Sequence, residues 1–241
     1  MKFFSRAIVS VLALVGMTAL GSTVAFAQAP AGAAAAQYTE GRHFTRLTPA
    51  VPQSTPAGTV EVTEVFSYGC PACFQASSYV ARLKKQLPAK VQMTYVPASW
   101  IQAEAWPMFQ RAYVTAQAMG IAEKTHDDMF QAIWRTGEIP LTDPATGRIR
   151  RPLPTIEDAA KFYAAHAGVK AEDFVAASKS FAVETKIGQA EKLVRAYRAE
   201  STPTFVVAGK YKVNNVGSYD DVMNIIRFLV DRELAEIGGK K

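Results

Sequence analysis

The hydrophobic and polar positions between residues 59 and 96 predict a strand, a helix and a second strand. Residues 59–66, TVEVTEVF, and residues 91–96, VQMTYV, are rich in β-branched side chains, which favour strands. Residues 71–86 lie between them and carry apolar side chains at the spacing of one helix face: Ala76, Val80, Leu83 and, just beyond, Leu87. This order of elements is typical of an α/β fold with a parallel strand pair.

The middle of the chain, residues 103–200, has an almost entirely helical pattern. One apolar stripe stops at Gly120, and its members are Phe109, Ala112, Tyr113, Ala116 and Met119. Further helices are predicted at 126–135, 155–168, 171–181 and 182–199. Thr155 and Asp158 have the spacing of a capping box, which marks the start of one of these helices. A long loop is predicted at 139–154.

After the helical block the pattern of strands returns. Residues 202–214, TPTFVVAGKYKVN, predict a hairpin that turns at 208–210. Ser218 and Asp221 have the spacing of a second capping box, at the start of an amphipathic helix that ends near residue 237. We therefore expect the strands on either side of the helical block to complete one sheet.

The first 27 residues have the pattern of a secretory signal peptide. Lys2 and Arg6 precede an apolar run. AFA at 25–27 fits a cleavage site, although cleavage after Ala29 fits as well. The alternative, an uncleaved membrane anchor, is disfavoured because the run is too short to span a bilayer comfortably. Residues 28–40 begin with an Ala/Pro/Gly-rich stretch and are expected to form a flexible leader. The sequence thus predicts export.

Composition narrows the class of protein and its partners. The chain has 241 residues, of which 49% are hydrophobic and 20% charged, and this is typical of globular domains. The formal charge is +6, and the densest basic cluster, at 148–151, has no interleaved aromatic residues, so no nucleic-acid partner is expected. An oxidising compartment favours disulfides, yet the chain has only two cysteines, Cys70 and Cys73.

The two cysteines lie in the stretch FSYGCPACFQ and allow four interpretations. Haem attachment needs C-x-x-C-H, and Phe74 follows the second cysteine. A zinc site needs four ligands, but His43, His126 and His166 lack ligand spacing and are expected as surface or core residues. Copper handling by two thiolates stays open, although no Met-rich run accompanies them. A structural disulfide this short would add little stability. The sequence therefore favours a redox pair and no metal.

The expected local structure makes the two cysteines unequal. Cys70 falls at the predicted helix N-cap, with Pro71 at the first helical position, where proline fits best. The unpaired amides and the positive end of the helix dipole favour a thiolate there. Cys73 lies further into the helix, within disulfide reach. We expect an exposed, acidic Cys70, which a client thiolate attacks first, and a more buried Cys73.

These segments resemble those of the DsbA-like thiol:disulfide oxidoreductases of the bacterial periplasm, within the thioredoxin superfamily. The matching pieces are EVFSYGCPACFQ at 64–75, KVQMTYV at 90–96, the helical block and TPTFVVAGKYKVN at 202–214, in the right order. The C-P-x-C motif alone is moderately specific. Together with the later Thr-Pro-Thr and the helical block between them, the resemblance is strongly specific and covers most of the chain after the signal peptide.

The resemblance implies both a fold and a reaction. The fold is α/β and thioredoxin-like, a central mixed β-sheet flanked by helices at 41–100 and 200–238, with an inserted α-helical domain at 101–199. The reaction is donation of the disulfide to reduced or unfolded exported proteins. Reoxidation implies a membrane quinone reductase of the DsbB type. No cofactor is implied, and a monomer in the periplasm of a Gram-negative bacterium is expected.

The resemblance also assigns site residues. Cys70 corresponds to the nucleophile and Cys73 to its buried partner. Pro203 corresponds to a proline that follows a cis bond and faces the disulfide, and Thr202 to the residue whose backbone pairs with a bound substrate peptide. Glu64 stands where the family carries a buried acid that helps to move the proton of the second cysteine.

Glu64 also has an independent argument from the strand pattern. It shares a predicted strand face with Val60, Val62 and Phe66, so burial and a raised pKa are expected. A partly exposed glutamate at the sheet edge is the alternative. Tyr95 falls where a Lys is expected near the buried acid.

Position 72 departs from the family pattern as well. Ala72 stands between the cysteines, where the best-known members carry His, and an alanine cannot stabilise the thiolate electrostatically. Pro71 and Ala72 are thus the residues expected to tune the active site, and Ala72 predicts a weaker oxidant than a His-bearing relative.

Two rival functions stay open at this stage. One is a disulfide isomerase or reductase, although residues 28–60 are too short for the N-terminal dimerisation domain that isomerases of the DsbC type usually carry. The other is a thiol metal chaperone or a redox-silent binding protein. Tyr68, Phe74 and Trp100 form either an apolar rim for unfolded clients or part of the core.

Overall fold

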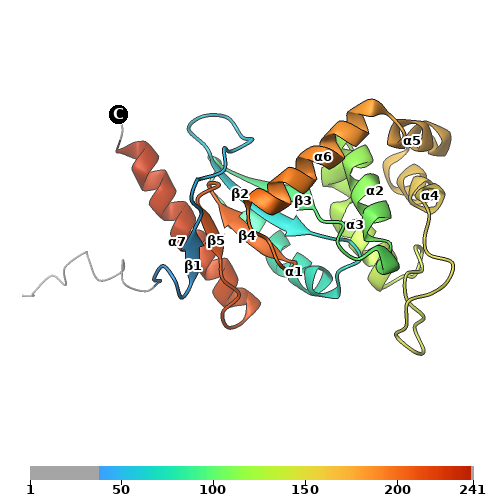
Figure 1. Cartoon of the computed structure of the whole chain (residues 1–241), viewed down its shortest axis with the longest axis horizontal. Helices are drawn as coiled ribbons and strands as arrows, with labels where there is room; N and C mark the ends of the chain where they lie inside the picture. Colours follow the sequence, from blue (N-terminus) through green and yellow to red (C-terminus); the bar gives the residue numbers. More distant parts are fainter. Residues whose placement is uncertain (1–37, 240–241) are drawn as a thin grey trace, which may run out of the picture. The chain divides into compact units, whose positions relative to one another are not determined.

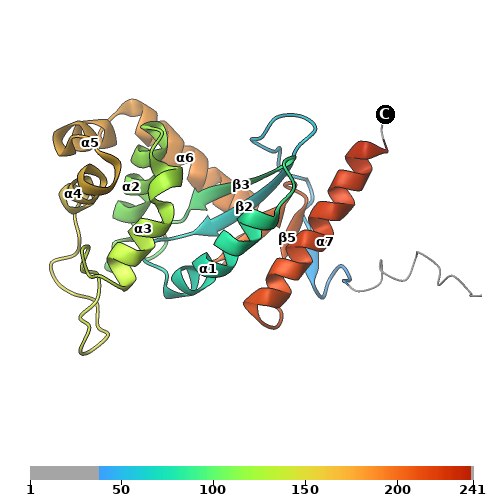
Figure 2. The same ribbon diagram turned by 180° about the vertical axis from the view of Figure 1, so that it is seen from behind.

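The computed structural model describes residues 38–239, which form a five-stranded mixed sheet with helices on both faces (Figures 1 and 2). The predicted signal peptide and residues 28–37 of the predicted leader lie outside the described residues. The strands are β1 (Phe44–Arg46), β2 (Val60–Phe66), β3 (Val91–Pro97), β4 (Thr204–Val207) and β5 (Tyr211–Val213). The helices are α1 (Pro71–Gln86), α2 (Trp106–Ala118), α3 (Ala122–Trp134), α4 (Ile156–Ala167), α5 (Ala171–Ser178), α6 (Phe181–Ala196) and α7 (Tyr219–Gly238), with a short 3-10 turn, η2 (Gln102–Glu104).

The sheet joins strands from both ends of the chain in the order β1-β5-β4-β2-β3. β2 and β3 are parallel, as the strand–helix–strand pattern predicts, and β4 runs antiparallel to β2. The predicted sheet closure across the helical block is therefore confirmed. β1 was not predicted, because three residues carry no readable alternation; pairing with β5, where Phe44 lies opposite Val213, defines it.

β2 is the centre of the fold, and all seven of its residues are buried. α1 and α7 lie on one face of the sheet, in front in Figure 2, and α6 lies on the other, in front in Figure 1. Val62 packs with Leu83 of α1 and Leu229 of α7 in one apolar cluster. Because both faces of β2 are covered, its polar side chains, Glu61, Thr63 and Glu64, are buried with it.

The helices α2–α6 lie between β3 and β4 in the sequence, as the predicted insertion requires, while its boundaries at 101 and 199 stay a prediction. Both predicted capping boxes are present, at Thr155–Asp158 and Ser218–Asp221. Gly120 has a left-handed backbone at the end of α2, with φ of 71°. No helix within 38–239 is long and apolar enough to cross a membrane.

Several predicted helix boundaries are wrong, and a cap explains the one between α5 and α6. The helix predicted at 126–135 begins earlier, at Ala122. The sequence pattern joins Phe181 to the preceding helix, but α5 ends at Ser178 and α6 begins at Phe181. The Ser180 hydroxyl accepts a hydrogen bond from the Val183 amide at 3.3 Å, so Ser180 is the N-cap of a new helix. α6 also ends at Ala196, earlier than predicted.

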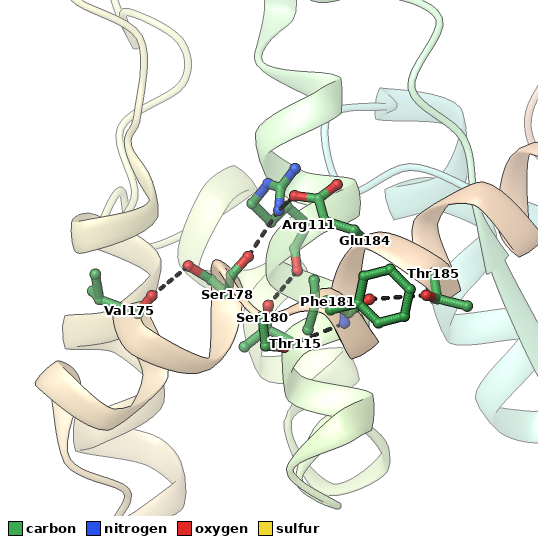
Figure 3. A network of polar contacts seen from close by, with 9 residues as sticks. Arg111, Thr115, Val175, Ser178, Ser180, Phe181, Glu184 and Thr185 are labelled. Carbon is green, nitrogen blue, oxygen red and sulfur yellow. Dashed lines mark hydrogen bonds and ion pairs between the residues drawn. The ribbon is translucent and has the colours of Figure 1, made fainter.

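The junction of α5 and α6 is fastened to α2 by one arginine (Figure 3). Arg111 of α2 donates to the Ser178 carbonyl at 2.7 Å and to Glu184 Oε1 at 2.6 Å. The Ser178 carbonyl is one of the C-terminal carbonyls that α5 leaves without an intrahelical donor. A side chain from a helix distant in the sequence thus caps the C-terminal end of α5 and links it to the first turn of α6.

The turn between β4 and β5 makes a specific demand on Gly209. Its φ is 62°, and a Cβ at this position would meet the Val51 carbonyl oxygen at 1.9 Å. The Val51 amide also donates to the Gly209 carbonyl at 2.9 Å, so the segment before β2 is held against this turn. Only glycine combines the positive φ with so close a backbone approach.

We predict that Gly209→Ala lowers the free energy of unfolding by more than about 2 kcal/mol, because it adds a backbone clash to a left-handed conformation. Gly120→Ala is the matched control: its φ is 71° but nothing lies within 4 Å of its Cβ. The control is expected to cost only about 1 kcal/mol. Denaturant unfolding of both variants measures the difference, and equal losses would contradict the steric argument.

Candidate active site

The cysteine pair lies at the start of α1, as the sequence predicts. Cys70 is the N-cap and Pro71 the first helical residue. The Cys70 sulfur accepts a hydrogen bond from the Cys73 amide at 3.4 Å. Both cysteines are free thiols. β2 ends four residues before Cys70, so the sheet delivers this sulfur to the exposed amides of the first helical turn.

A segment 132 residues later in the chain meets the same sulfur. The Cys70 thiol donates to the Thr202 carbonyl oxygen at 3.5 Å. The Thr202–Pro203 peptide bond is cis, which confirms the expectation for this bond. β4 starts directly after it and pairs with β2, so the sheet places the end of β2 and the start of β4 side by side.

The cysteines differ in burial, but Cys70 is not the exposed residue that the sequence suggested. Its exposed fraction is only 5%, and that of Cys73 is 0%. The expectation was wrong because the loop before β4 lies over the sulfur, with the Thr202 carbonyl in contact. The expected order of accessibility is confirmed, because Cys70 is more exposed than Cys73.

The pKa values of the two thiols are displaced in opposite directions. Hydrogen bonding from the Cys73 thiol lowers the pKa of Cys70 to about 6, helped by the Thr202 side chain and by the amides of Cys73 and Ala72, although burial opposes it. Burial raises the pKa of Cys73 well above its usual value, and the hydrogen bond to Cys70 and the nearby Glu64 charge add to this. In the reduced pair the negative charge is therefore concentrated on Cys70.

Glu64 is buried within the sheet rather than exposed at an edge. It lies opposite Tyr95 on β3 and Phe205 on β4, and its exposed fraction is 2%. Burial, followed by the charges of Cys70 and Asp127, raises the pKa of Glu64 to about 8. The carboxyl is thus mostly protonated at neutral pH, beneath the cysteine pair.

On the strand beside Glu64, Tyr95 occupies the position where a lysine was expected. Tyr95 is half-buried, and its ring centroid lies 4.1 Å from that of His126. His126 is buried, its Nδ1 is hydrogen bonded to the Tyr68 hydroxyl at 3.0 Å, and burial lowers its pKa to about 3. His126 is therefore a neutral core residue, one of the two roles expected for it.

Two tryptophans that the sequence did not single out hold the turn before Cys70. The Trp134 indole N–H donates to the Tyr68 carbonyl at 2.8 Å. A Cβ on Gly69 would lie 2.8 Å from the Trp106 ring, so glycine allows that ring to lie against the backbone. Both tryptophans come from the helical insertion, and no local sequence signal links them to this turn.

The proposed apolar rim is only partly present. Tyr68 is 1% exposed and belongs to the core, so for this residue the rim interpretation was wrong. Phe74 is half-buried and stacks on Trp134 at a centroid distance of 6.1 Å. Trp100 is 39% exposed. Trp100 and Phe74 thus retain exposed apolar surface.

A groove beside the cysteine pair is formed by segments from three parts of the chain. Its lining includes Ala72 and Tyr79 of α1, Thr202 and Pro203, and Tyr219 and Val222 of α7. The Tyr219 hydroxyl donates to the Ala72 carbonyl at 2.9 Å. The sequence predicted the cap that starts α7 but carried no signal that Tyr219 reaches the active-site turn.

Within residues 38–239, no three His, Cys, Asp or Glu side chains come together so as to hold a metal ion. His166, in the helical insertion, is hydrogen bonded to Glu138 at 3.0 Å. The groups that act on the two thiols instead include the Glu64 carboxyl and the backbone amides of Ala72 and Cys73.

Comparison with known proteins places this site in a wider group. The thiol:disulfide interchange protein DsbA of Pseudomonas aeruginosa is 30% identical over 226 residues, covering 93% of this chain and 97% of that protein. DsbA of Pseudomonas syringae is 32% identical, over 81% and 84% of the two chains. The crystal structure of oxidoreductase DsbA from Xylella fastidiosa has a TM-score of 0.72 at 31% identity, covering 82% of this chain and 98% of that one. No family model matches the chain.

The fold and the similarity together define a class and a family. A thioredoxin fold with a helical insertion, carrying C-P-x-C at the start of its first helix, is the fold of a thiol:disulfide oxidoreductase. The chain belongs to the DsbA family of thiol:disulfide interchange proteins. The fold and the enzyme class expected from the sequence are thereby confirmed.

We predict that Glu64→Gln removes a pH-dependent loss of stability. The pKa of Glu64 is about 8 in the folded chain and 4.5 for an unperturbed glutamate, the value taken for the unfolded chain. Between about pH 4.5 and 8 the unfolded chain loses this proton more readily, so the free energy of unfolding falls as pH rises. In the reduced protein at pH 7, the variant should exceed wild type by about 3 kcal/mol in its free energy of unfolding.

The measurement is denaturant unfolding of both reduced proteins at several pH values. Taking the difference at each pH removes contributions common to both proteins, including most of that from Cys70. The difference should be small at pH 4 and grow up to pH 8. A difference that is constant across this range would show that Glu64 does not titrate in it.

Proposed function

We propose that the chain donates the Cys70–Cys73 disulfide to reduced exported proteins. The observation that carries the proposal is the opposite displacement of the two thiol pKa values, with that of Cys70 lowered and that of Cys73 raised. A stabilised thiolate favours the reduced form of the pair, and so makes its disulfide an oxidant. The similarity to DsbA proteins supports the same direction of transfer.

The proposed reaction has two exchange steps. A client thiolate attacks the Cys70 sulfur, the Cys70–Cys73 bond breaks, and Cys73 leaves as a thiolate. A second client thiolate then attacks the client sulfur of the mixed disulfide, and Cys70 leaves as a thiolate. The client loses two electrons and gains a disulfide, while the pair gains two electrons. The lowered pKa of Cys70 makes it a good leaving group in the second step.

Glu64 has a role in the first of these steps. Cys73 leaves into a buried site where its raised pKa favours the thiol. Glu64 is mostly protonated at neutral pH and interacts electrostatically with Cys73. We infer that Glu64 supplies the proton that Cys73 takes up. Tyr95 lies opposite the acid on the neighbouring strand, where its phenol offers no positive charge.

The groove beside the pair is the proposed site for the client peptide. Thr202 would pair its backbone with an extended client chain, next to the sulfur that the client attacks. Pro203 is buried and contributes to the lining of the same groove. The predicted signal peptide supports a periplasmic location, and a membrane quinone reductase of the DsbB type is the proposed oxidant of the reduced pair. The proposed enzyme acts as a monomer.

We predict that Cys70→Ser and Cys73→Ser both lose oxidation of a dithiol peptide, by at least about 1000-fold, because neither can form the internal disulfide. Only Cys73→Ser should still form a mixed disulfide with oxidised glutathione at neutral pH, because it keeps the acidic thiol. Mass spectrometry of the adducts separates the variants.

Three results would count against the proposal. Rapid adduct formation by Cys70→Ser would overturn the assignment of Cys70 as nucleophile. Failure of the oxidised wild type to oxidise the peptide would overturn the donor function. Faster reshuffling of a scrambled disulfide than oxidation of a dithiol would instead favour the isomerase.

We predict that Ala72→His makes the enzyme a stronger oxidant. An imidazolium between the cysteines would stabilise the Cys70 thiolate, which the alanine cannot do. The equilibrium constant for oxidising glutathione should rise at least about tenfold, which corresponds to lowering the pKa of Cys70 by about one unit or more. Ala72→Gln is the control for size and polarity without charge. An equal rise in both variants, or none in Ala72→His, would contradict the electrostatic explanation.

A further inference from the structure

We propose that Tyr219 is a positioning residue for the cysteine pair, which acts through the peptide group between Ala72 and Cys73. Its hydroxyl holds and polarises this peptide group, whose amide is aimed at the Cys70 sulfur. The inference deepens the proposed function and rests on it only in treating Cys70 as the reactive thiol.

The geometry places one peptide group between two hydrogen bonds. The Tyr219 hydroxyl donates to the Ala72 carbonyl oxygen at 2.9 Å. The Cys73 amide donates to the Cys70 sulfur at 3.4 Å. This carbonyl and this amide belong to the same planar unit, so a bond that fixes one end also fixes the direction of the other.

The two hydrogen bonds also reinforce each other electronically. A donor at the carbonyl draws charge toward the oxygen and makes the N–H at the other end a stronger donor. Cooperative strengthening of this kind is about 10–30% per bond. The Cys70 thiolate accepts hydrogen bonds first from the Cys73 thiol and then from the Cys73 and Ala72 amides. A stronger Cys73 amide donor thereby lets Tyr219 stabilise the thiolate without touching the sulfur.

Several contacts hold the Tyr219 side chain in place. It is the first residue of α7, directly after the Ser218 cap. Its ring lies against that of Tyr79 at a centroid distance of 5.2 Å. Arg82 lies over the Tyr79 ring at 4.5 Å and pairs with Asp220 at 3.1 Å. The phenol is therefore directed at α1 by both helices.

The hydroxyl remains a donor throughout the working range of pH. Burial raises the pKa of Tyr219 above 10.0, and the charges of Cys73 and Cys70 raise it further. A phenol that stays protonated donates to the Ala72 carbonyl whether the pair is thiol or thiolate. Ala72 lacks a side chain that could act on the sulfur, so its backbone is the route by which position 72 influences Cys70.

The test compares two phenol-to-phenyl changes in the same groove. Tyr219→Phe removes the hydroxyl that binds Ala72 and keeps the ring. Tyr79→Phe is the matched control. The Tyr79 ring lines the same groove and lies beside Tyr219, but within residues 38–239 its hydroxyl makes no hydrogen bond to the active-site turn. The pKa of Cys70 is measured in the reduced full-length mature proteins from the pH dependence of alkylation, and the redox equilibrium is measured against glutathione.

We expect Tyr219→Phe to raise the pKa of Cys70 by about 0.5. The equilibrium constant for oxidising glutathione at pH 7 should then fall about two- to threefold. Tyr79→Phe should change neither. An unchanged or lowered Cys70 pKa in Tyr219→Phe overturns the proposal, and so does an equal rise in both variants, which would assign the effect to the groove as a whole.

Two further readouts keep the result unambiguous. Thermal unfolding of the oxidised proteins reports general loss of structure, and it should change little in either variant. Oxidation of a dithiol peptide by the wild type reports the proposed function. If the wild type fails that assay while Tyr219→Phe still raises the Cys70 pKa, the donor function is wrong and the positioning role stands.

Discussion

The site depends on one constraint: the Cys70 sulfur must lie at the start of a helix and against the loop before β4 at the same time. The helix provides the Cys73 amide, and the loop provides the Thr202 carbonyl. Both reach the sulfur only because β2 and β4 are neighbouring antiparallel strands, so the end of one meets the start of the other. The sheet order is therefore a condition for the chemistry.

Burial raises the pKa of each acid around this sulfur, but at Cys70 hydrogen-bond donors outweigh it. Glu64 and Cys73 have few charge-stabilising partners, so burial raises their pKa values. Cys70 is also largely buried, yet its pKa is lowered because a thiol and nearby amides donate to it. The difference between the two cysteines thus arises because Cys70 receives hydrogen bonds from the Cys73 thiol and from amides that are free only at the helix start, while burial dominates at Cys73.

Much of the fold could be predicted from the sequence because its signals are local. Both capping boxes, the helix stop at Gly120 and the long strands β2 and β3 appear as predicted. The prediction failed where long-range pairing decides: β1 exists only beside β5. It also failed at Ser180, where periodicity continues but a cap divides α5 from α6.

For the site, the sequence by itself determined the cysteine pair, its place at a helix start and the burial of Glu64, because each follows from neighbours a few residues away. Only the tertiary structure decided how accessible Cys70 is and which distant groups touch its turn. The loop at Thr202 covers the sulfur, Trp134 holds the Tyr68 carbonyl, and Tyr219 holds the Ala72 carbonyl. These partners lie 66 to 147 residues away, and such contacts follow from packing, which local patterns do not encode.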